Sequence, residues 1–151
     1  MDAPPRPPTL VFLDFDGVMH PVRCHVNDHF CNLKLFEEVM REFPGVQIVI
    51  ASTWREAYLL SDIRQRFSPD IGARIIGKTP TWDDGTDEHI RYREIRQYLG
   101  QPKLAGAKWI ALDDADFEFP DRCPNLLLCD SNQAFDARVA AELRARLQAL
   151  D

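Results

Sequence analysis

Short apolar runs that alternate with amphipathic segments constrain the fold of this 151-residue chain most strongly. The runs VFL, IVI and LLL are almost continuously apolar, as strands are when both faces of their sheet are covered. The segments between the runs have apolar residues near helical spacing, as in Leu33, Phe36, Met40 and Phe43. Strands that alternate with helices form βαβ units, so the sequence predicts an α/β fold, a Rossmann-like three-layer α/β/α sandwich with a central parallel sheet.

The boundaries of the expected elements follow from this pattern and from the turn residues around it. We expect strands at residues 9–14, 46–52, 73–77, 108–114 and 125–130. We expect helices at residues 32–43, 54–67, 87–100 and 135–150. Asn32 is placed to cap the first helix, Thr53 with Glu56 has the form of a capping box for the second, and Gly100 ends the third.

Length and composition are those of one ordinary globular domain. There is no internal repeat or domain boundary, so residues 9–151 are expected to form one domain after a Pro-rich, disordered lead at residues 1–8. The lead lacks the apolar core of a signal peptide and no run approaches the ~20 residues of a membrane span, so we expect a cytoplasmic protein. A net charge of −6 argues against broad adhesion to nucleic acid or anionic membranes and leaves a local basic patch open.

The four cysteines, Cys24, Cys31, Cys123 and Cys129, form no C-x-x-C pair. Cys129 lies in the apolar run NLLLCD and is expected to be a core thiol. The segment HPVRCHVNDHFC gathers three histidines and two cysteines, which would suit zinc. We favour a polar loop with incidental histidines, because no second ligand pair with finger spacing follows.

Polar side chains stand where the expected strands end. Asp14 and Asp16 close the first strand, Ser52 closes the second, and Asp113 with Asp114 closes the strand over residues 108–114. In an open parallel sheet, ligands bind beyond the carboxyl ends of the strands. Crowded carboxylates repel one another and need protons or a cation, and an all-oxygen cluster suits Mg²⁺. The sequence therefore predicts a Mg²⁺ site formed by Asp14, Asp16, Asp113 and Asp114.

Such a site suggests the chemistry of phosphate esters. Asp14 would attack phosphorus as the nucleophile, since carboxylates form aspartyl-phosphate intermediates. Asp16 would give a proton to the departing alkoxide and later take one from the hydrolytic water. Gly17 would let the chain turn sharply away from the strand.

These residues resemble the motifs of the haloacid dehalogenase-like (HAD) hydrolase superfamily, from Thr9 to about Phe135. Asp14-Phe15-Asp16-Gly17 resembles motif I, D-x-D-G; Ser52 resembles motif II, which bonds the phosphate; Asp113-Asp114 resembles the paired-acid motif IV, which holds Mg²⁺. The order ASTWR, R-x-R-E-I and ALDD is similar to a small branch without a cap domain, some members of which sit beside RNA-repair enzymes. In paired acids of this family the second often reaches the metal, which favours Asp114 over Asp113.

The motif III cation that the resemblance implies has three candidates, Lys78, Arg91 and Arg93. We favour Arg91, because family patterns place this cation near a helix start shortly before the motif IV strand. The alternative for each arginine is a solvated helix face paired with Glu88 or Glu94.

Residues next to the motifs are the candidates for contacts with the substrate. A cation in the first turn of a helix, as Arg55 would be, is disfavoured by the helix dipole, which makes a role near the substrate or the Asp cluster plausible. Trp54 is expected to be a packing residue rather than a base-stacking platform. The candidate substrate-binding residues are Gly17, Thr53, Arg55 and Arg93.

The second aspartate separates the branches of the family, because a halide leaves without a proton and an alkoxide does not. We therefore expect a phosphatase rather than a dehalogenase. Neither gap between the motifs has room for a substantial cap, so an open site would suit a large phosphorylated substrate, with a nucleotide or nucleic-acid end preferred. The loop at residues 20–30, with its histidines and Arg23, is the expected substitute for a lid. The rival hypothesis is a catalytically weak HAD-fold module that binds a metal or a partner.

Overall fold

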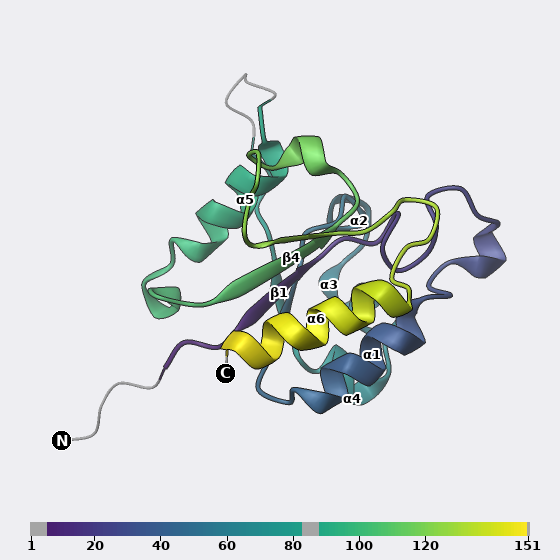
Figure 1. Cartoon of the computed structure of the whole chain (residues 1–151), viewed down its shortest axis with the longest axis horizontal. Coiled ribbons are helices and arrows are strands. Elements are labelled where there is room, and N and C mark those ends of the chain that lie inside the picture. Colours follow the sequence, from purple (N-terminus) through teal and green to yellow (C-terminus); the bar gives the residue numbers. More distant parts are fainter. Residues whose placement is uncertain (1–5, 83–87, 151) are drawn as a thin grey trace.

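The computed structural model describes residues 6–82 and 88–150, and its core is a parallel sheet of five strands in the order β3-β2-β1-β4-β5 (Figure 1). The strands are β1 (Leu10–Leu13), β2 (Gln47–Ile50), β3 (Ile75–Lys78), β4 (Trp109–Asp113) and β5 (Leu126–Leu128). The expected parallel sheet and the place of each strand are confirmed. Most of the expected disordered lead, residues 1–5, lies outside the described residues.

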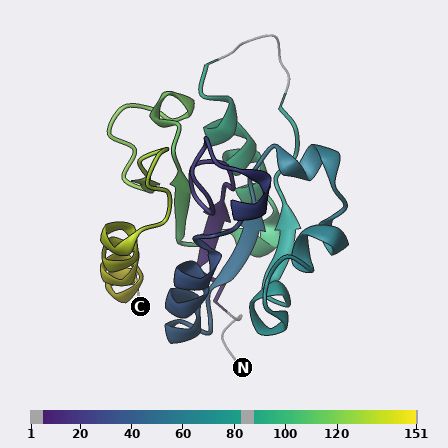
Figure 2. The ribbon, with the colours of Figure 1, turned by 90° about the vertical axis from the view of Figure 1, so that its right-hand side faces the viewer.

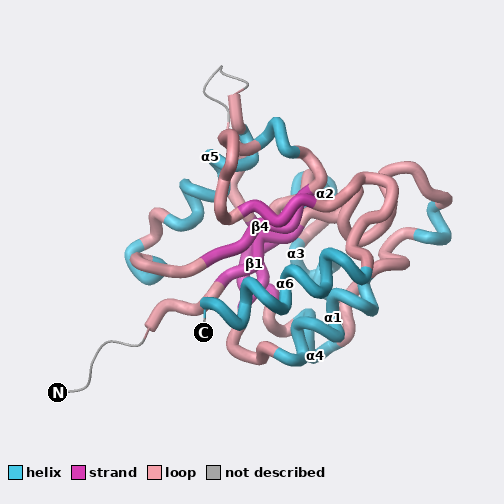
Figure 3. Tube along the Cα trace, viewed as in Figure 1, coloured by secondary structure: helices cyan, strands magenta, loops and turns pink. Residues whose placement is uncertain are grey.

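Helices cover both faces of the sheet, as the near-continuous apolar runs require. Figure 3 shows α1, α4 and α6 on one side and α5 on the other. The α-helices are α1 (Leu33–Glu42), α2 (Trp54–Ala57), α3 (Leu60–Arg64), α4 (Pro69–Gly72), α5 (Ile90–Leu99) and α6 (Ala137–Leu150). Short 3₁₀ helices are η1 (Val26–Asp28), η2 (Pro102–Leu104) and η3 (Asp116–Glu118).

Alternate residues of each strand enter two separate cores. On β1, Val11 and Leu13 pack with α1 and α6, whereas Phe12 packs with α5 and the η3 region. Phe12 lies edge-on to Tyr98 and to Trp109, with ring centroids 5.8 and 5.7 Å away. β1 is therefore buried on both sides, and the three-layer prediction is confirmed.

The order of the strands creates a switch point beside β1. The chain runs from β1 outward through β2 to β3, and then returns to place β4 on the other side of β1. Leu13 pairs with Ile50 of β2 and with Leu112 of β4, so the residues that follow each of them lie at one level of the sheet. That register brings Asp14 and Asp113 side by side at the carboxyl edge.

The second expected helix differs from the structure. Residues 54–67 form two short helices, α2 and α3, because Tyr58 and Leu59 have extended backbone. The prediction of a capping box at Thr53 is wrong. Thr53 has helical backbone (φ −60°, ψ −18°), and its side chain makes no capping hydrogen bond. A capping side chain needs an extended residue, and here the Ser52 hydroxyl accepts the N–H of Trp54 instead, at 3.2 Å.

The capping role expected for Asn32 is also wrong. Its side chain makes no capping bond, and its amide instead donates to the carbonyl of Phe135 at 3.0 Å, which links the start of α1 to the segment before α6. The helix ending at Gly100 is confirmed, as is the buried stripe of α6. Asp87, the expected start of the third helix, lies outside the described residues. No described helix has the length and apolar character that a membrane span needs.

Candidate active site

Three carboxylates gather at the carboxyl edge of the sheet, where the strand register predicts a site. Asp14 follows β1, Asp113 ends β4, and Asp114 comes next along the chain. Each offers an oxygen, and these oxygens lie within 4.8 Å of one another. Asp14 and Asp113 are buried and Asp114 is half-buried, so water does little to screen their repulsion. Within the described residues this is the group whose spacing suits a metal ion.

Arg91, in the first turn of α5, compensates the two buried acids. Its Nη1 lies 3.1 Å from Oδ1 of Asp14 and 2.8 Å from Oδ2 of Asp113. Its Nε is buried and has no hydrogen-bond partner in the described part of the chain. Of the three motif III candidates, Arg91 is thus the one in ion-pair contact with the expected nucleophile. Lys78 is exposed and donates to the carbonyl of Arg55 at 3.4 Å, and Arg93 lies half-buried on α5.

One arginine does not neutralise the cluster. Burial, and then the charge of Asp113, raise the pKa of Asp14 well above its usual value despite the attraction of Arg91. Burial likewise raises the pKa of Asp113 to about 6. For Arg91, burial favours the neutral form, but the charges of Asp113 and Asp14 outweigh it and raise the pKa. The site therefore lacks positive charge, which a divalent cation would supply.

Gly17 allows Asp114 to enter the cluster. A side-chain Cβ at Gly17 would lie within 2.1 Å of Oδ2 of Asp114, and the residue has a φ of +80°. A larger residue at position 17 is disfavoured for two reasons: the Asp114 carboxylate fills the space that a Cβ would need, and a positive φ suits glycine. Asp114 is held on its other side by the hydroxyl of Ser131, at 2.8 Å. The N–H of Gly17, an expected substrate contact, donates to the carbonyl of His20 at 2.8 Å.

Asp16 lies apart from the three carboxylates that could share a metal. Its Oδ1 is 2.7 Å from Nε2 of His20 and its Oδ2 accepts the indole N–H of Trp54 at 3.2 Å. The Nδ1 of His20 accepts the backbone N–H of Phe30 at 3.2 Å, so the proton of the imidazole is on Nε2 and is donated to Asp16. The two donors orient the Asp16 carboxylate at the rim of the site. The structure thus places Asp16, an expected metal ligand, outside the group.

His20 and Trp54 hold Asp16, a role that the sequence does not predict for either residue. The sequence indicates zinc or a lid for His20 and packing for Trp54. The sequence cue that could have paired His20 with Asp16 is their separation of four residues across the turn at Gly17. In the structure the two residues form an isolated parallel β-bridge. Among the described residues, the group spaced to hold a metal ion is Asp14, Asp113 and Asp114, and it contains no histidine or cysteine of this loop.

Arg55, an expected substrate contact, points into the protein instead. Its guanidinium donates to Glu94 at 2.7 Å and to the carbonyls of Thr79, Ser52 and Pro80 at 2.9, 2.9 and 3.4 Å. Both charged side chains are nearly fully buried. The dipole argument missed this ion pair, because the partner comes from α5, 39 positions away. Ser52 is also fully buried at the end of β2, whereas Thr53 is exposed beside it.

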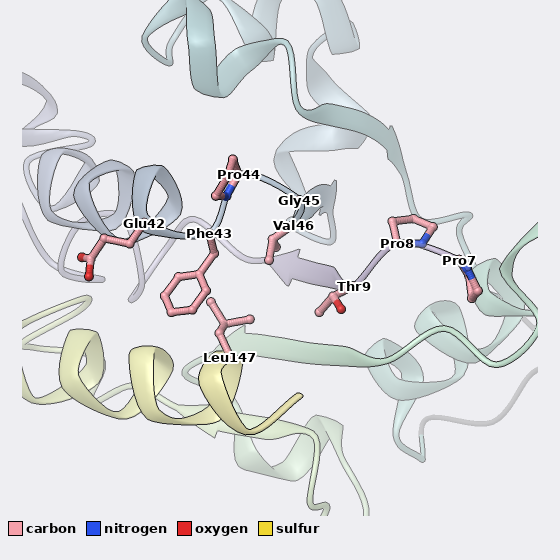
Figure 4. Close-up of a pocket in the computed structure, with 9 residues that line it drawn as sticks. All are labelled: Pro7, Pro8, Thr9, Glu42, Phe43, Pro44, Gly45, Val46 and Leu147. Atoms are coloured by element: carbon pink, nitrogen blue, oxygen red, sulfur yellow. The ribbon is translucent and has the colours of Figure 1, made fainter. Parts of the chain in front are cut away.

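A hollow at the opposite edge of the sheet does not belong to this site. It has a volume of about 420 Å³ and is lined by Pro7, Pro8, Thr9, Glu42, Phe43, Pro44, Gly45, Val46 and Leu147 (Figure 4). These residues come before β1 and β2 and from the ends of α1 and α6. Its one carboxylate, that of Glu42, accepts a hydrogen bond from Nε of Arg144 at 2.7 Å.

Comparison with protein families agrees with the fold and the carboxylate cluster. The family described as the HAD domain in Swiss Army Knife RNA repair proteins matches residues 10–140. The chain belongs to this family, and the resemblance read from its motifs is confirmed. The family supports a hydrolase-type activity in general terms. Neither the curated proteins nor the solved structures that were compared include a match to this chain.

The buried ion pair gives the first prediction. Arg55→Met leaves Glu94 buried and unpaired, so it should lower the free energy of unfolding by about 3–5 kcal/mol. Denaturant unfolding measures this. Arg41→Met is the matched control, because Arg41 forms an exposed pair with Asp70 at 2.8 Å that water and salt screen, so this variant should lose far less stability than Arg55→Met. Similar small losses in both variants would contradict the structural role of Arg55.

The raised pKa of Asp113 gives the second prediction, for metal-free protein in a chelator. A carboxyl whose folded pKa is about 6 binds its proton more tightly when folded, so its contribution to stability declines as pH rises from about 4 to about 7. Asp113→Asn removes this titration. The free energy of unfolding of the variant, minus that of wild type, should therefore increase by on the order of 2 kcal/mol as the pH rises over that range. A difference that is independent of pH would contradict the burial argument.

Proposed function

We propose that the protein is a Mg²⁺-dependent phosphomonoester hydrolase that acts through an aspartyl-phosphate on Asp14, with Asp16 as general acid and base. The observation that carries the proposal is the contact of Arg91 with Asp14 and Asp113 inside a three-carboxylate cluster. A buried nucleophile beside a fixed cation and a metal-ligand set is what transfer of a phosphoryl group requires. The family match supports the hydrolase class.

The residues fit a hard divalent cation. Asp14, Asp113 and Asp114 offer only oxygen, which Mg²⁺ prefers. Burial, together with the charge of neighbouring carboxylates, raises the pKa of Asp14 and of Asp113, so the site favours an added positive charge. Mg²⁺ bound there would neutralise these carboxylates and the oxygens of a phosphate. Asp16 is left out of this ligand set in our proposal, because its carboxylate is held by His20 and Trp54.

The steps then follow from the chain's own residues. An oxygen of Asp14 attacks phosphorus as the bond to the leaving oxygen breaks, and protonated Asp16 gives its proton to that oxygen. Asp16 then takes a proton from water, whose oxygen attacks the phosphorus of the aspartyl-phosphate and restores the Asp14 carboxylate. Arg91 neutralises charge on the transferring group, and Ser52 stands at the end of β2 as the phosphate contact that motif II implies.

The substrate we propose is a phosphate on a nucleotide or at a nucleic-acid end. Between the motifs, the described residues form only the sheet, its covering helices and loops, so the described chain contains no cap domain over the cluster. An open site admits a large substrate. Thr53 and Arg93, the remaining candidate contacts, lie at the end of β2 and on α5 near Arg91.

One observation favours the alternative, a catalytically weak module that binds a metal or a partner. Both oxygens of Asp16 are engaged, one by His20 and one by Trp54, so one of these bonds must open before the acid can reach a leaving group. The intact pair of aspartates favours the enzyme, because a binding module has no use for the second acid.

A third prediction separates the two functions. Wild type should hydrolyse p-nitrophenyl phosphate only with Mg²⁺, and Asp14→Asn should reduce kcat by at least about a thousandfold, because the nucleophile is lost. Asp70→Asn is the control: it is an aspartate on the surface ion pair with Arg41 and should keep full activity. Turnover absent from wild type with every phosphoester, together with retained metal binding, would favour the binding module.

A fourth prediction concerns the proton that Asp16 supplies. Asp16→Asn should lower kcat/KM for alkyl phosphates by roughly a hundredfold or more, and less for p-nitrophenyl phosphate, whose leaving group needs little protonation. Steady-state kinetics on both esters measure the ratio. Equal losses on the two esters would remove Asp16 from the acid role.

A further inference from the structure

A cluster of three aromatic rings and one arginine stands beside Asp16. We call Phe30, Trp54, Tyr58 and Arg66 the ring cluster. The guanidinium carbon of Arg66 lies 5.6, 5.5 and 5.8 Å from the ring centres of Phe30, Trp54 and Tyr58. The ring centroids of Trp54 and Tyr58 are 5.3 Å apart, and the two rings are tilted by 32°. The ring cluster therefore joins three segments that are distant in sequence: the loop with η1, α2, and the turn after α3.

The ring cluster is connected directly to the proposed general acid, because the indole N–H of Trp54 donates to Oδ2 of Asp16. In phosphoryl transfer the attacking and leaving oxygens lie roughly in line, so the leaving group departs on the side of the acid. The Asp16 side chain is 47 % exposed and that of Asp14 is 8 % exposed. The leaving group thus faces outward, toward the ring cluster. Figure 2 shows the loop with η1 in the foreground, next to the α2 and α3 segments.

Two members of the ring cluster remain open to a ligand. Tyr58 is 43 % exposed and Arg66 is exposed. No carboxylate of the described residues forms an ion pair with Arg66, whose recorded contacts are the three rings. A surface cation on a ring stabilises a fold by roughly 0.5–1 kcal/mol, which would explain one such contact. A purely stabilising role would not explain why the exposed ring of Tyr58 and the guanidinium of Arg66, which has no carboxylate partner among the described residues, both lie on the leaving-group side of Asp16.

The ligand that matches is flat, aromatic and anionic. Exposed rings stack on nucleobases, and an arginine held over rings keeps its edge free for a phosphate. A sugar phosphate without a base would leave the rings in water. A single strand offers a base next to its terminal phosphate and a phosphodiester one nucleotide further on, which are the groups that an exposed ring and an arginine beside Asp16 would bind.

We propose that the ring cluster is the leaving-group subsite for a single-stranded nucleic-acid end. The terminal nucleoside stacks on Tyr58, which Trp54 supports from behind, and Arg66 binds the neighbouring phosphodiester. This inference rests on the proposed function for its catalytic readout. It also supplies the local basic contact that the net charge of −6 leaves open.

Three alkyl esters of increasing complexity test the proposal: glycerol 3-phosphate, a nucleoside monophosphate and a dinucleotide with a terminal phosphate, in both the 5′ and 3′ series. Within the 5′ series all three leaving oxygens are primary alkoxides, so differences report binding of the base and the phosphodiester; in the 3′ series the mononucleotide and the dinucleotide share a secondary leaving oxygen and are compared with each other. We expect kcat/KM to rise on the order of tenfold with the base and again with the second nucleotide. The second increase should decline with added salt.

Variants assign these increases to residues. Tyr58→Ala should lower the ratio of kcat/KM for the nucleoside monophosphate to kcat/KM for glycerol 3-phosphate by on the order of tenfold. Arg66→Gln should lower the ratio of kcat/KM for the dinucleotide to kcat/KM for the mononucleotide. Arg144→Gln is the matched control, since this arginine forms a surface pair with Glu42 on α6, and both ratios should remain unchanged. Thermal unfolding of each variant checks that the fold is kept.

The outcomes separate this inference from the proposed function. Equal kcat/KM for all three esters, or a preference for a phosphotyrosyl peptide, would overturn the subsite while leaving the phosphatase intact. If no ester is turned over, the proposed function fails. Binding of a labelled phosphorylated oligonucleotide to wild type then tests whether the ring cluster binds a nucleic-acid end. Binding weakened by Tyr58→Ala but not by Arg144→Gln would support it, and no binding would overturn it.

Discussion

The contact of Arg91 with Asp14 and Asp113 is the interaction on which the site depends. Two carboxylates that leave the sheet at one level would otherwise be buried together at a high electrostatic cost. The same helix, α5, presents Glu94 to Arg55, and positions 91 and 94 lie on one helix face. The helix α5 thus partly compensates the charges of Asp14 and Asp113 and also holds α2 through Arg55. The ionic contacts of Arg91 and Glu94 therefore hold α5 in place and also bring Arg91 to the carboxylates of the site.

The tight turn at Gly17 has a comparable double effect. It clears the space that Asp114 occupies, and it brings His20 back to Asp16 within four residues. The strand that carries Asp14 and the residue that supports Asp16 are therefore parts of one local structure. Asp14 is fixed by the sheet register, whereas the side-chain contacts that the described residues make with Asp16 come from His20 and Trp54, which would suit the proton exchange that we propose for it.

Much of the fold could be predicted from the sequence, because strand runs and helical periodicity are local signals. The position of Asp14 and of Asp113 at one sheet edge also follows from local pattern, since parallel strands end at a common edge. What could not be predicted depends on partners far along the chain. Arg55 was assigned to substrate because Glu94 is not visible as its partner in sequence, and the capping box at Thr53 failed because its backbone conformation is set by the turn after β2.

A crystal structure with Mg²⁺ and a phosphate mimic such as trifluoroberyllate tests the central claim most directly. The account predicts one cation bound by oxygens of Asp14, Asp113 and Asp114, the mimic joined to Asp14, and Arg91 against its charged atoms. A cation bound elsewhere, or a mimic that leaves Asp14 still paired only with Arg91, would contradict the account.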